Sequence, residues 1–175
     1  SLQAMTKTGD YILLQQTIFY GAWQAAERLG LKVITIPTHP EHGIDLNAFE
    51  QAIQKYPIKV CLLMLNCHNP IGFTVKDEIK FQLAKLLHQH EIHLIEDDVY
   101  EELYYDQKKP LSMKYFDQQN LVLHCSSFSK TLGAGFRIGW VYAGKFSEHI
   151  QHIQLMSTLS VNPFIHNALV EYLSH

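Results

Sequence analysis

The chain has 175 residues, of which 47% are hydrophobic and 18% charged, a composition that excludes a disordered protein and favours a sizeable buried core. Its formal net charge of −3 argues against a surface that coats nucleic acid. Its longest apolar run, residues 60–65, is far shorter than the roughly 20 residues that a membrane-spanning helix needs.

Strand-like apolar runs alternate with segments of helical periodicity along the whole chain. We expect strands at residues 12–14, 33–36, 60–65, 92–95, 121–123 and 138–143. We expect helices at residues 22–29 (ended by Gly30), from the N-cap Asp45 to Pro57, from the N-cap Thr74 to Leu87, from Ser147 to Ile153, and from Pro163 to Leu173. This alternation predicts an α/β domain with a mostly parallel sheet.

Polar clusters follow three of the predicted strands. Residues 60–65 lead into Asn66, His68 and Asn69; residues 92–95 lead into Glu96, Asp97 and Asp98; and residues 121–123 lead into Ser126, Ser127, Ser129 and Lys130. In an open parallel sheet the carboxyl ends of the strands share one edge, where ligands bind. We therefore expect amide, carboxylate, hydroxyl and amine groups to line one cleft.

Each cluster has a simpler explanation when it is taken alone. Residues 69–72 are typical of a tight turn, and residues 96–98 could form a solvated acidic loop, although one carboxylate after an apolar strand should be partly buried. Residues 126–130, with Arg137, suit an anion, but the GxxxxGK[ST] order of a phosphate-binding loop is absent. Residues 133–135 lack the third glycine of a dinucleotide fingerprint, which disfavours a nucleotide-binding domain.

Taken in order, the three clusters resemble the fold-type I pyridoxal 5′-phosphate enzymes, specifically the class I and II aminotransferases. The matching motifs are Asn69-Pro70-Ile71-Gly72, then Asp97-x-x-Tyr100, then Ser127-Phe128-Ser129-Lys130 with Arg137 beyond, and the resemblance covers nearly the whole chain. It implies the three-layer α/β/α large domain of that family.

The resemblance assigns four residues to the cofactor ring. Lys130 would hold the cofactor aldehyde covalently, since a desolvated amine is a good nucleophile. Asp97 would pair with the protonated pyridine nitrogen and keep the ring an electron sink. Asn69 and Tyr100 would hydrogen-bond the phenolic oxygen of the ring.

The same resemblance assigns the remaining cofactor contacts. Ser127, Ser129 and Arg137 would hold the phosphate, and Phe19 would stack on the ring, with Tyr20 as a possible substitute. The family often has a proline two residues before this aromatic residue, where this chain has Thr17.

Two acidic residues and the histidines receive no role in this assignment. Glu96 and Asp98 match no catalytic position, so we expect them at the surface or in a cap. The chain has 11 histidines, but no HExxH or Cys/His cluster, and we expect no metal site.

Finer sequence features are similar to the MocR group of GntR-type bacterial transcription regulators. These features are residues 96–98, residues 128–132, the step from Lys130 to Arg137, and residues 162–169. Such regulators join a winged helix-turn-helix to an aminotransferase-like domain that senses pyridoxal phosphate or an amino compound. Kynurenine- and α-aminoadipate-type aminotransferases share the same lysine-to-arginine spacing, so a true aminotransferase that acts on an amino acid and a 2-oxo acid is the alternative.

The resemblance also sets expectations for the whole protein. Residues 1–175 would be a large-domain fragment that lacks the first strand, the small domain and any DNA-binding domain, and that is inactive in transamination by itself. Its ligand besides the cofactor would be an amino acid or amine, DNA would be bound only through the missing N-terminal domain, and the parent would be a homodimer. The absence of a signal peptide and of a disulfide framework predicts a cytoplasmic protein without membrane contact.

Overall fold

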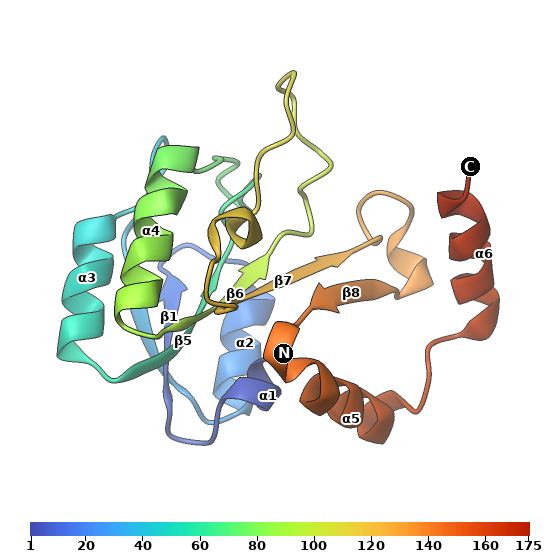
Figure 1. Cartoon of the computed structure of the whole chain (residues 1–175), viewed down its shortest axis with the longest axis horizontal. Helices are drawn as coiled ribbons and strands as arrows, with labels where there is room; N and C mark the ends of the chain where they lie inside the picture. Colours follow the sequence, from blue (N-terminus) through green and yellow to red (C-terminus); the bar gives the residue numbers. More distant parts are fainter.

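A six-stranded sheet forms the centre of the molecule in a computed structural model that describes residues 1–175 (Figure 1). Its strand order is β2-β1-β5-β6-β7-β8. The strands are β1 (Tyr11–Gln15), β2 (Lys32–Ile36), β5 (Ile58–Leu63), β6 (His93–Asp97), β7 (Val122–Ser127) and β8 (Gly139–Tyr142). Every neighbouring pair is parallel except β7 and β8, which are antiparallel. The predicted mostly parallel sheet is confirmed.

Helices cover both faces of this sheet. The helices are α1 (Leu2–Met5), α2 (Tyr20–Arg28), α3 (Leu46–Lys55), α4 (Asp77–Gln89), α5 (Ser147–Thr158) and α6 (Pro163–Leu173), and the 3₁₀ turns are η1 (Met113–Phe116), η2 (Ala134–Phe136) and η3 (Gly144–Phe146). Side chains of α3 and α4 belong to one hydrophobic cluster, whereas those of α1, α2 and α5 pack in the other. The architecture is therefore the expected three-layer α/β/α sandwich.

The central strands are continuously apolar because both of their faces are buried. On β1, Leu13 packs in the cluster beneath α3 and α4, while Ile12 and Leu14 pack in the opposite cluster. On β5, Cys61 and Leu62 divide in the same way. A strand between two helical layers must bury successive side chains in both directions, which removes the polar alternation of a half-exposed strand.

Helix ends follow local side-chain chemistry in two of three predicted cases. Asp45 caps α3, because its Oδ1 accepts hydrogen bonds from the backbone N–H groups of Asn47 and Ala48 at 2.9 and 3.0 Å. Gly30 follows the end of α2 with a φ of +66°, the left-handed conformation that favours glycine. The third prediction, the Thr74 cap, is wrong.

Thr74 instead stabilises the turn that precedes α4. Its Oγ1 accepts a hydrogen bond from the backbone N–H of Cys67 at 3.1 Å. The helix begins three residues later, at Asp77, and its first turn carries Asp77 and Glu78, which favour the positive end of the helix dipole.

Some features were not visible in the sequence pattern. The two-stranded sheet of β3 (Thr38–His39) and β4 (Gly43–Ile44) is too short to produce an alternating pattern. At the other end of the chain, α6 has no buried residue and lies away from the main sheet (Figure 1). No helix combines the length and the apolar character that crossing a bilayer demands.

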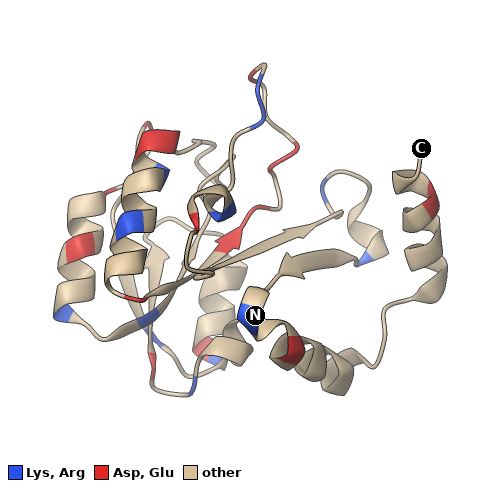
Figure 2. Cartoon of the chain, viewed as in Figure 1, with Lys and Arg blue, Asp and Glu red and all other residues tan.

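Charged side chains are spread over most elements (Figure 2). Lysines and arginines occur on helices, strands and loops, with acidic residues among them, and a red stretch marks the end of β6 at the centre of the sheet. This acidic strand end lies within the fold, so it is the place where charge requires a structural explanation.

We predict that replacing the cap residue Asp45 with alanine lowers the free energy of unfolding by about 1 kcal/mol, because two N–H groups of α3 lose their acceptor. Chemical denaturation measures the change. Asp45→Asn is the matched control and should lose only a few tenths of that value, since its side-chain oxygen can still accept. Equal losses in both variants would contradict the capping explanation.

Candidate cofactor-binding site

The carboxyl ends of three adjacent parallel strands, β5, β6 and β7, meet at one edge of the sheet. A cavity of about 980 Å³ opens at this edge. All eight residues that the sequence assigned to cofactor binding line it, namely Phe19, Asn69, Asp97, Tyr100, Ser127, Ser129, Lys130 and Arg137. The convergence predicted from strand topology is thus found in part, because each of the three strand ends contributes to the cavity but Asn66, His68, Glu96 and Asp98 do not line it. The roles of the individual residues stay predictions.

Asp97 is the last residue of β6 and supplies a carboxylate to the cavity. Burial raises its pKa, the backbone N–H of Val99 opposes the rise, and the neighbouring charge of Asp98 adds to it. No lysine, arginine or histidine nitrogen lies within 4.0 Å of this carboxylate. A partly buried acid without a cationic partner suits a ligand that brings its own positive charge.

The amine and its neighbours approach from three loops, those that follow β5, β6 and β7. The Nζ atom of Lys130 lies 5.3 Å from the centre of the Tyr100 ring. The side-chain amide of Asn69 donates to the hydroxyl of Tyr100 at 3.4 Å. An amine, a phenol and an amide from three different loops therefore face the same space as Asp97.

The anion-binding end of the cavity is built from β7 and the turn that follows it. Ser127 Oγ accepts a hydrogen bond from the backbone N–H of Ser129 at 3.3 Å. The guanidinium of Arg137 donates to Ser129 Oγ at 3.5 Å and to the carbonyl of Ala134 at 3.1 Å. Arg137 has a φ of +52°, a strained conformation for a residue other than glycine. The surrounding turn thus holds this forked donor beside two serine hydroxyls.

Gly139 lets β8 approach the serine-bearing end of β7. It pairs with Ser127 in the antiparallel register. A Cβ atom at this position would lie 2.8 Å from the carbonyl oxygen of Ser126 and 3.0 Å from Ser127 Cβ. Only glycine therefore fits without moving the strand that positions Ser127.

The aromatic assignment receives support from position. Phe19 occupies the N-cap of α2 and lines the cavity, whereas Tyr20 does not line it and is 68% exposed. The two rings pack against each other with their centres 4.5 Å apart. Of the two candidates, Phe19 is the one placed to cover a ring in the cavity.

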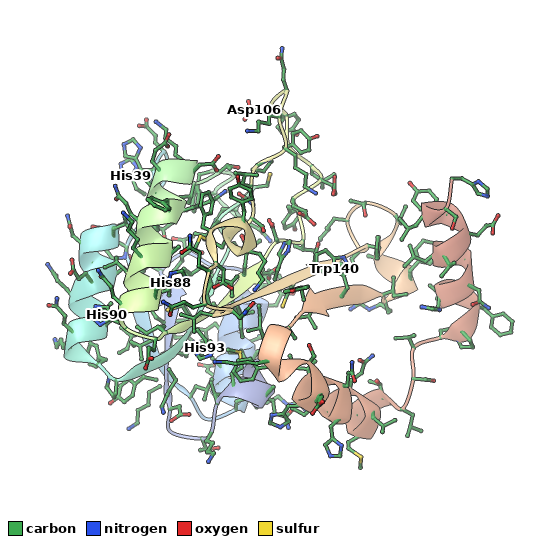
Figure 3. The ribbon with its side chains drawn as sticks, in the orientation of Figure 1. His39, His88, His90, His93, Asp106 and Trp140 are labelled. Atoms are coloured by element: carbon green, nitrogen blue, oxygen red, sulfur yellow. The ribbon has the colours of Figure 1, made fainter.

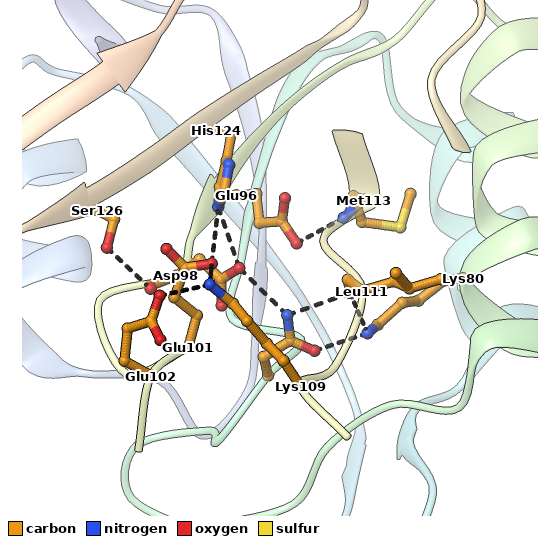
Figure 4. A network of polar contacts seen from close by, with 11 residues as sticks. Lys80, Glu96, Asp98, Glu101, Glu102, Lys109, Leu111, Met113, His124 and Ser126 are labelled. Atoms are coloured by element: carbon orange, nitrogen blue, oxygen red, sulfur yellow. Dashed lines mark hydrogen bonds and ion pairs between the residues drawn. The ribbon is translucent and has the colours of Figure 1, made fainter. Parts of the chain in front are cut away.

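The expected surface position of Glu96 and Asp98 is wrong. Both side chains are buried, with 0% and 1% exposure. Glu96 Oε1 accepts from the backbone N–H of Met113 at 2.8 Å, and Asp98 Oδ2 lies 3.1 Å from His124 Nε2 (Figure 4). The reason is strand alternation: Glu96 points away from Asp97, and the face that it enters is also covered by helices. The continuous apolar run that leads into these residues was the available signal.

Burial and neighbouring charges change the pKa values of this acidic group. Desolvation raises the pKa of Glu96 to about 7, and the charge of Asp98 adds to the rise. The pKa of His124 is also raised: desolvation lowers it, but the hydrogen bond to Asp98 and the charges of Glu96, Asp98 and Glu101 together outweigh desolvation. One side-chain oxygen or nitrogen from each of Glu96, Asp98 and His124 lies within 4.8 Å of the other two. The sequence analysis missed this grouping because β6, the loop after it and β7 supply one residue each.

Three of the histidines, His88, His90 and His93, lie near the end of α4 and the start of β6 (Figure 3). His88 Nε2 lies 3.5 Å from a carboxylate oxygen of Asp117, and the His93 ring packs edge-on against Phe146 at 5.1 Å between centres. These two side chains thus have separate structural neighbours.

Comparison with known proteins identifies the family. The model of aminotransferase class I and II matches residues 1–172. The chain belongs to the aminotransferase class I and II family. Its fold is also similar to that of a solved kynurenine aminotransferase from Pyrococcus horikoshii in complex with PMP, with a TM-score of 0.85 and 26% identity over 93% of this chain and 42% of that one.

Two curated relatives of this family member are transcription regulators by name. The uncharacterized HTH-type transcriptional regulator YdcR of Escherichia coli K12 is 55% identical over 99% of this chain and 37% of its own length. YjiR, a second uncharacterized HTH-type regulator of that strain, is 40% identical over 88% of this chain and 33% of its own length. The chain thus spans about a third of the length of these relatives.

We predict that Gly139→Ala destabilises the fold by about 1–3 kcal/mol, the usual result of overpacking, because the new Cβ would press on Ser126 and Ser127. Thermal and denaturant melts measure it. Gly135→Ala is the matched control, since a Cβ there meets nothing within 4 Å. A stability of Gly139→Ala equal to that of the control would show that β8 moves freely.

We predict that ionisation of the buried Glu96 side chain lowers the free energy of unfolding as the pH rises. Its folded pKa, about 7, lies above its ordinary value of 4.5, so its contribution is fully present below pH 4.5 and is lost as the pH rises through 7. Glu96→Gln, which cannot ionise, should therefore gain stability relative to the natural chain between pH 5 and pH 8 in urea titrations. Glu50→Gln, at an exposed site, is the control, and parallel curves for all three proteins would contradict the burial effect.

Proposed function

We propose that residues 1–175 form a pyridoxal 5′-phosphate-binding domain of the aminotransferase type, which serves as the ligand-sensing part of an HTH-type transcriptional regulator. The observation that carries the first half is the single cavity shared by the Lys130 amine, the Asp97 carboxylate and the Arg137 guanidinium. These groups match, in kind and number, an aldehyde, a protonated ring nitrogen and a phosphate.

The residues of this chain would act as follows. Asp97 would hold a proton on the ring nitrogen, which its partly buried carboxylate, without a cationic partner in the chain, is suited to do. Asn69 and Tyr100, already in contact, would orient the ring through its phenolic oxygen. The bound cofactor would supply an electron-withdrawing ring and an aldehyde that captures amines.

The remaining contacts would fix the cofactor in place. Arg137 and the hydroxyls of Ser127 and Ser129 would bind the phosphate, with the guanidinium as a charged, forked donor. Phe19 would cover one face of the ring and exclude water. Lys130 would provide the amine for covalent attachment, and a free amino acid or amine would compete with it for the aldehyde.

The regulator half of the proposal rests on the relatives. A relative 55% identical over nearly the whole chain bears the name of an HTH-type regulator, which favours a longer protein with a DNA-binding domain and a dimeric organisation. A true aminotransferase is the alternative, favoured by the likeness to a kynurenine aminotransferase at 26% identity. Both functions require the same cavity.

We predict that the chain acquires a visible absorption band when pyridoxal 5′-phosphate is added, and that Lys130→Ala removes it. Lys85→Ala, which replaces an exposed lysine of α4, controls for nonspecific reaction and should keep the band. A band of equal intensity in Lys130→Ala would refute the assignment of the reactive amine.

A second experiment separates regulator from enzyme in the longer protein that contains this chain. For a regulator, pyridoxal 5′-phosphate with an amine should change its affinity for promoter DNA, and Lys130→Ala should abolish the response. For an aminotransferase, amino-group transfer from an amino acid to a 2-oxo acid should be measurable, with no DNA binding.

A further inference from the structure

A buried polar cluster lies on the face of the sheet opposite the cavity. Its centre is Lys80 of α4, a lysine with 0% exposure. Its Nζ atom donates to Asn66 Oδ1 and to the carbonyl oxygen of Leu111, both at 2.6 Å (Figure 4). An ammonium group so deeply buried is stable only when its hydrogen bonds are made, so these contacts constrain the segments that supply the acceptors.

Asn66 connects Lys80 to the loop after β6, which contains Asp98. Its side-chain nitrogen donates to Asp98 Oδ2 at 3.2 Å and to the carbonyl of Leu111 at 3.3 Å. The orientation of the amide is therefore fixed, because its oxygen must face the ammonium and its nitrogen the carboxylate. Turning the amide over would place two donors together at Lys80 and two acceptors together at Asp98.

The two joined loops are the ones that carry cavity residues. Asn66 precedes Asn69 by three positions in the loop after β5, and Asp98 precedes Tyr100 by two in the loop after β6. The loops thus meet twice, at Asn66–Asp98 within the buried cluster and at Asn69–Tyr100 in the cavity.

The main chain between these contacts is itself hydrogen-bonded. In the first loop, the N–H of His68 donates to the carbonyl of Phe73 at 2.9 Å. In the second loop, the carbonyl oxygen of Asp98 accepts a hydrogen bond from the hydroxyl of Ser126 at 3.1 Å. The backbone N–H of Asp98 donates to the carbonyl of Cys125 at 2.9 Å. A shift of Asn66 relative to Asp98 would therefore move Asn69 relative to Tyr100.

We propose that Lys80, Asn66 and Asp98 form a buried clamp that positions Asn69 and Tyr100 for the ring of the cofactor from the opposite face of the sheet. The inference rests on the proposed function. None of the three clamp residues lines the cavity, so they are positioning residues that act through Asn69 and Tyr100.

The first test replaces Lys80 with methionine, an unbranched side chain one heavy atom shorter, which removes the charge and the hydrogen-bond donor. We expect pyridoxal 5′-phosphate affinity, titrated by absorbance well below the melting temperature, to fall by roughly tenfold or more, since Asn66 Oδ1 loses its donor and the Leu111 carbonyl loses the shorter of its two hydrogen bonds. Leu87→Ala, a cavity-forming change at a fully buried position of the same helix, is the destabilised control and should keep its affinity within about twofold. Equal affinity losses in the two variants would show that Lys80 acts only through the general stability of the fold, which would overturn the proposal.

A second measurement needs no cofactor. Lys80→Met should speed amide hydrogen exchange at His68 and Glu101, whose N–H groups are hydrogen-bonded within the two loops, by more than Leu87→Ala does. If the natural chain and Lys130→Ala give the same absorption band when pyridoxal 5′-phosphate is added, the proposed function fails. The exchange comparison still tests the clamp in that case, because it needs no cofactor. Unchanged exchange at both loops would refute the clamp itself.

Two further comparisons distinguish positioning from folding if Lys80→Met does not fold. Asp98→Asn can still accept the hydrogen bond from Asn66 and should keep most of the affinity that Asp98→Ala loses. In a double-mutant cycle, the effect of Asp98→Ala should shrink when Asn69 is already alanine, because the clamp acts through that side chain. Additive effects, or equal losses in Asp98→Asn and Asp98→Ala, would contradict the proposal.

Discussion

The burial of both faces of a parallel sheet is the constraint on which the rest of the structure depends. Because β6 lies between two helical layers, its side chains have no solvent-facing side, and successive acidic residues at its end must enter different environments. Asp97 enters the cavity at the carboxyl edge, and Glu96 enters the interior beneath α4 and η1. The same alternation therefore creates a ligand-facing carboxylate and a buried acid whose neighbours must satisfy it.

The two faces are consequently not independent. The polar cluster around Lys80 lies where an apolar core would ordinarily be expected, and buried ionic groups are weak evidence for stability by themselves. Its hydrogen bonds instead join the loops after β5 and β6, which bring Asn69 and Tyr100 into the cavity. We therefore infer that the polar cluster serves to position these two loops, since directional hydrogen bonds specify loop positions more narrowly than apolar contacts do.

Family membership and the residues that line the cavity both favour the binding of pyridoxal 5′-phosphate. The regulator and enzyme functions share this binding and differ in whether the amino group is transferred. Relatives with regulator names are about three times as long as this chain. A domain that senses an amine through a cofactor and a domain that transfers its amino group need the same carboxylate, amine and anion site. The eight residues assigned to the cofactor are expected to be common to both proposed functions, so the cavity by itself does not distinguish them.

The sequence by itself determined a mostly parallel α/β domain and the order of its main elements, because strand and helix periodicities are local. The resemblance of its motifs to class I and II aminotransferases supplied the three-layer architecture and the eight residues assigned to the cofactor, all of which line the cavity. The sequence pattern misplaced the start of α4, where Thr74 bonds to Cys67 rather than to the helix, and it missed the short strands β3 and β4. Only the tertiary structure decided the environments of Lys80, Glu96 and Asp98. In the sequence, Lys80 has the pattern of an exposed polar position on an amphipathic helix. Its hydrogen-bond partners lie 14 and 31 residues away along the chain. Such partners are set by the packing of distant elements, which no local pattern records.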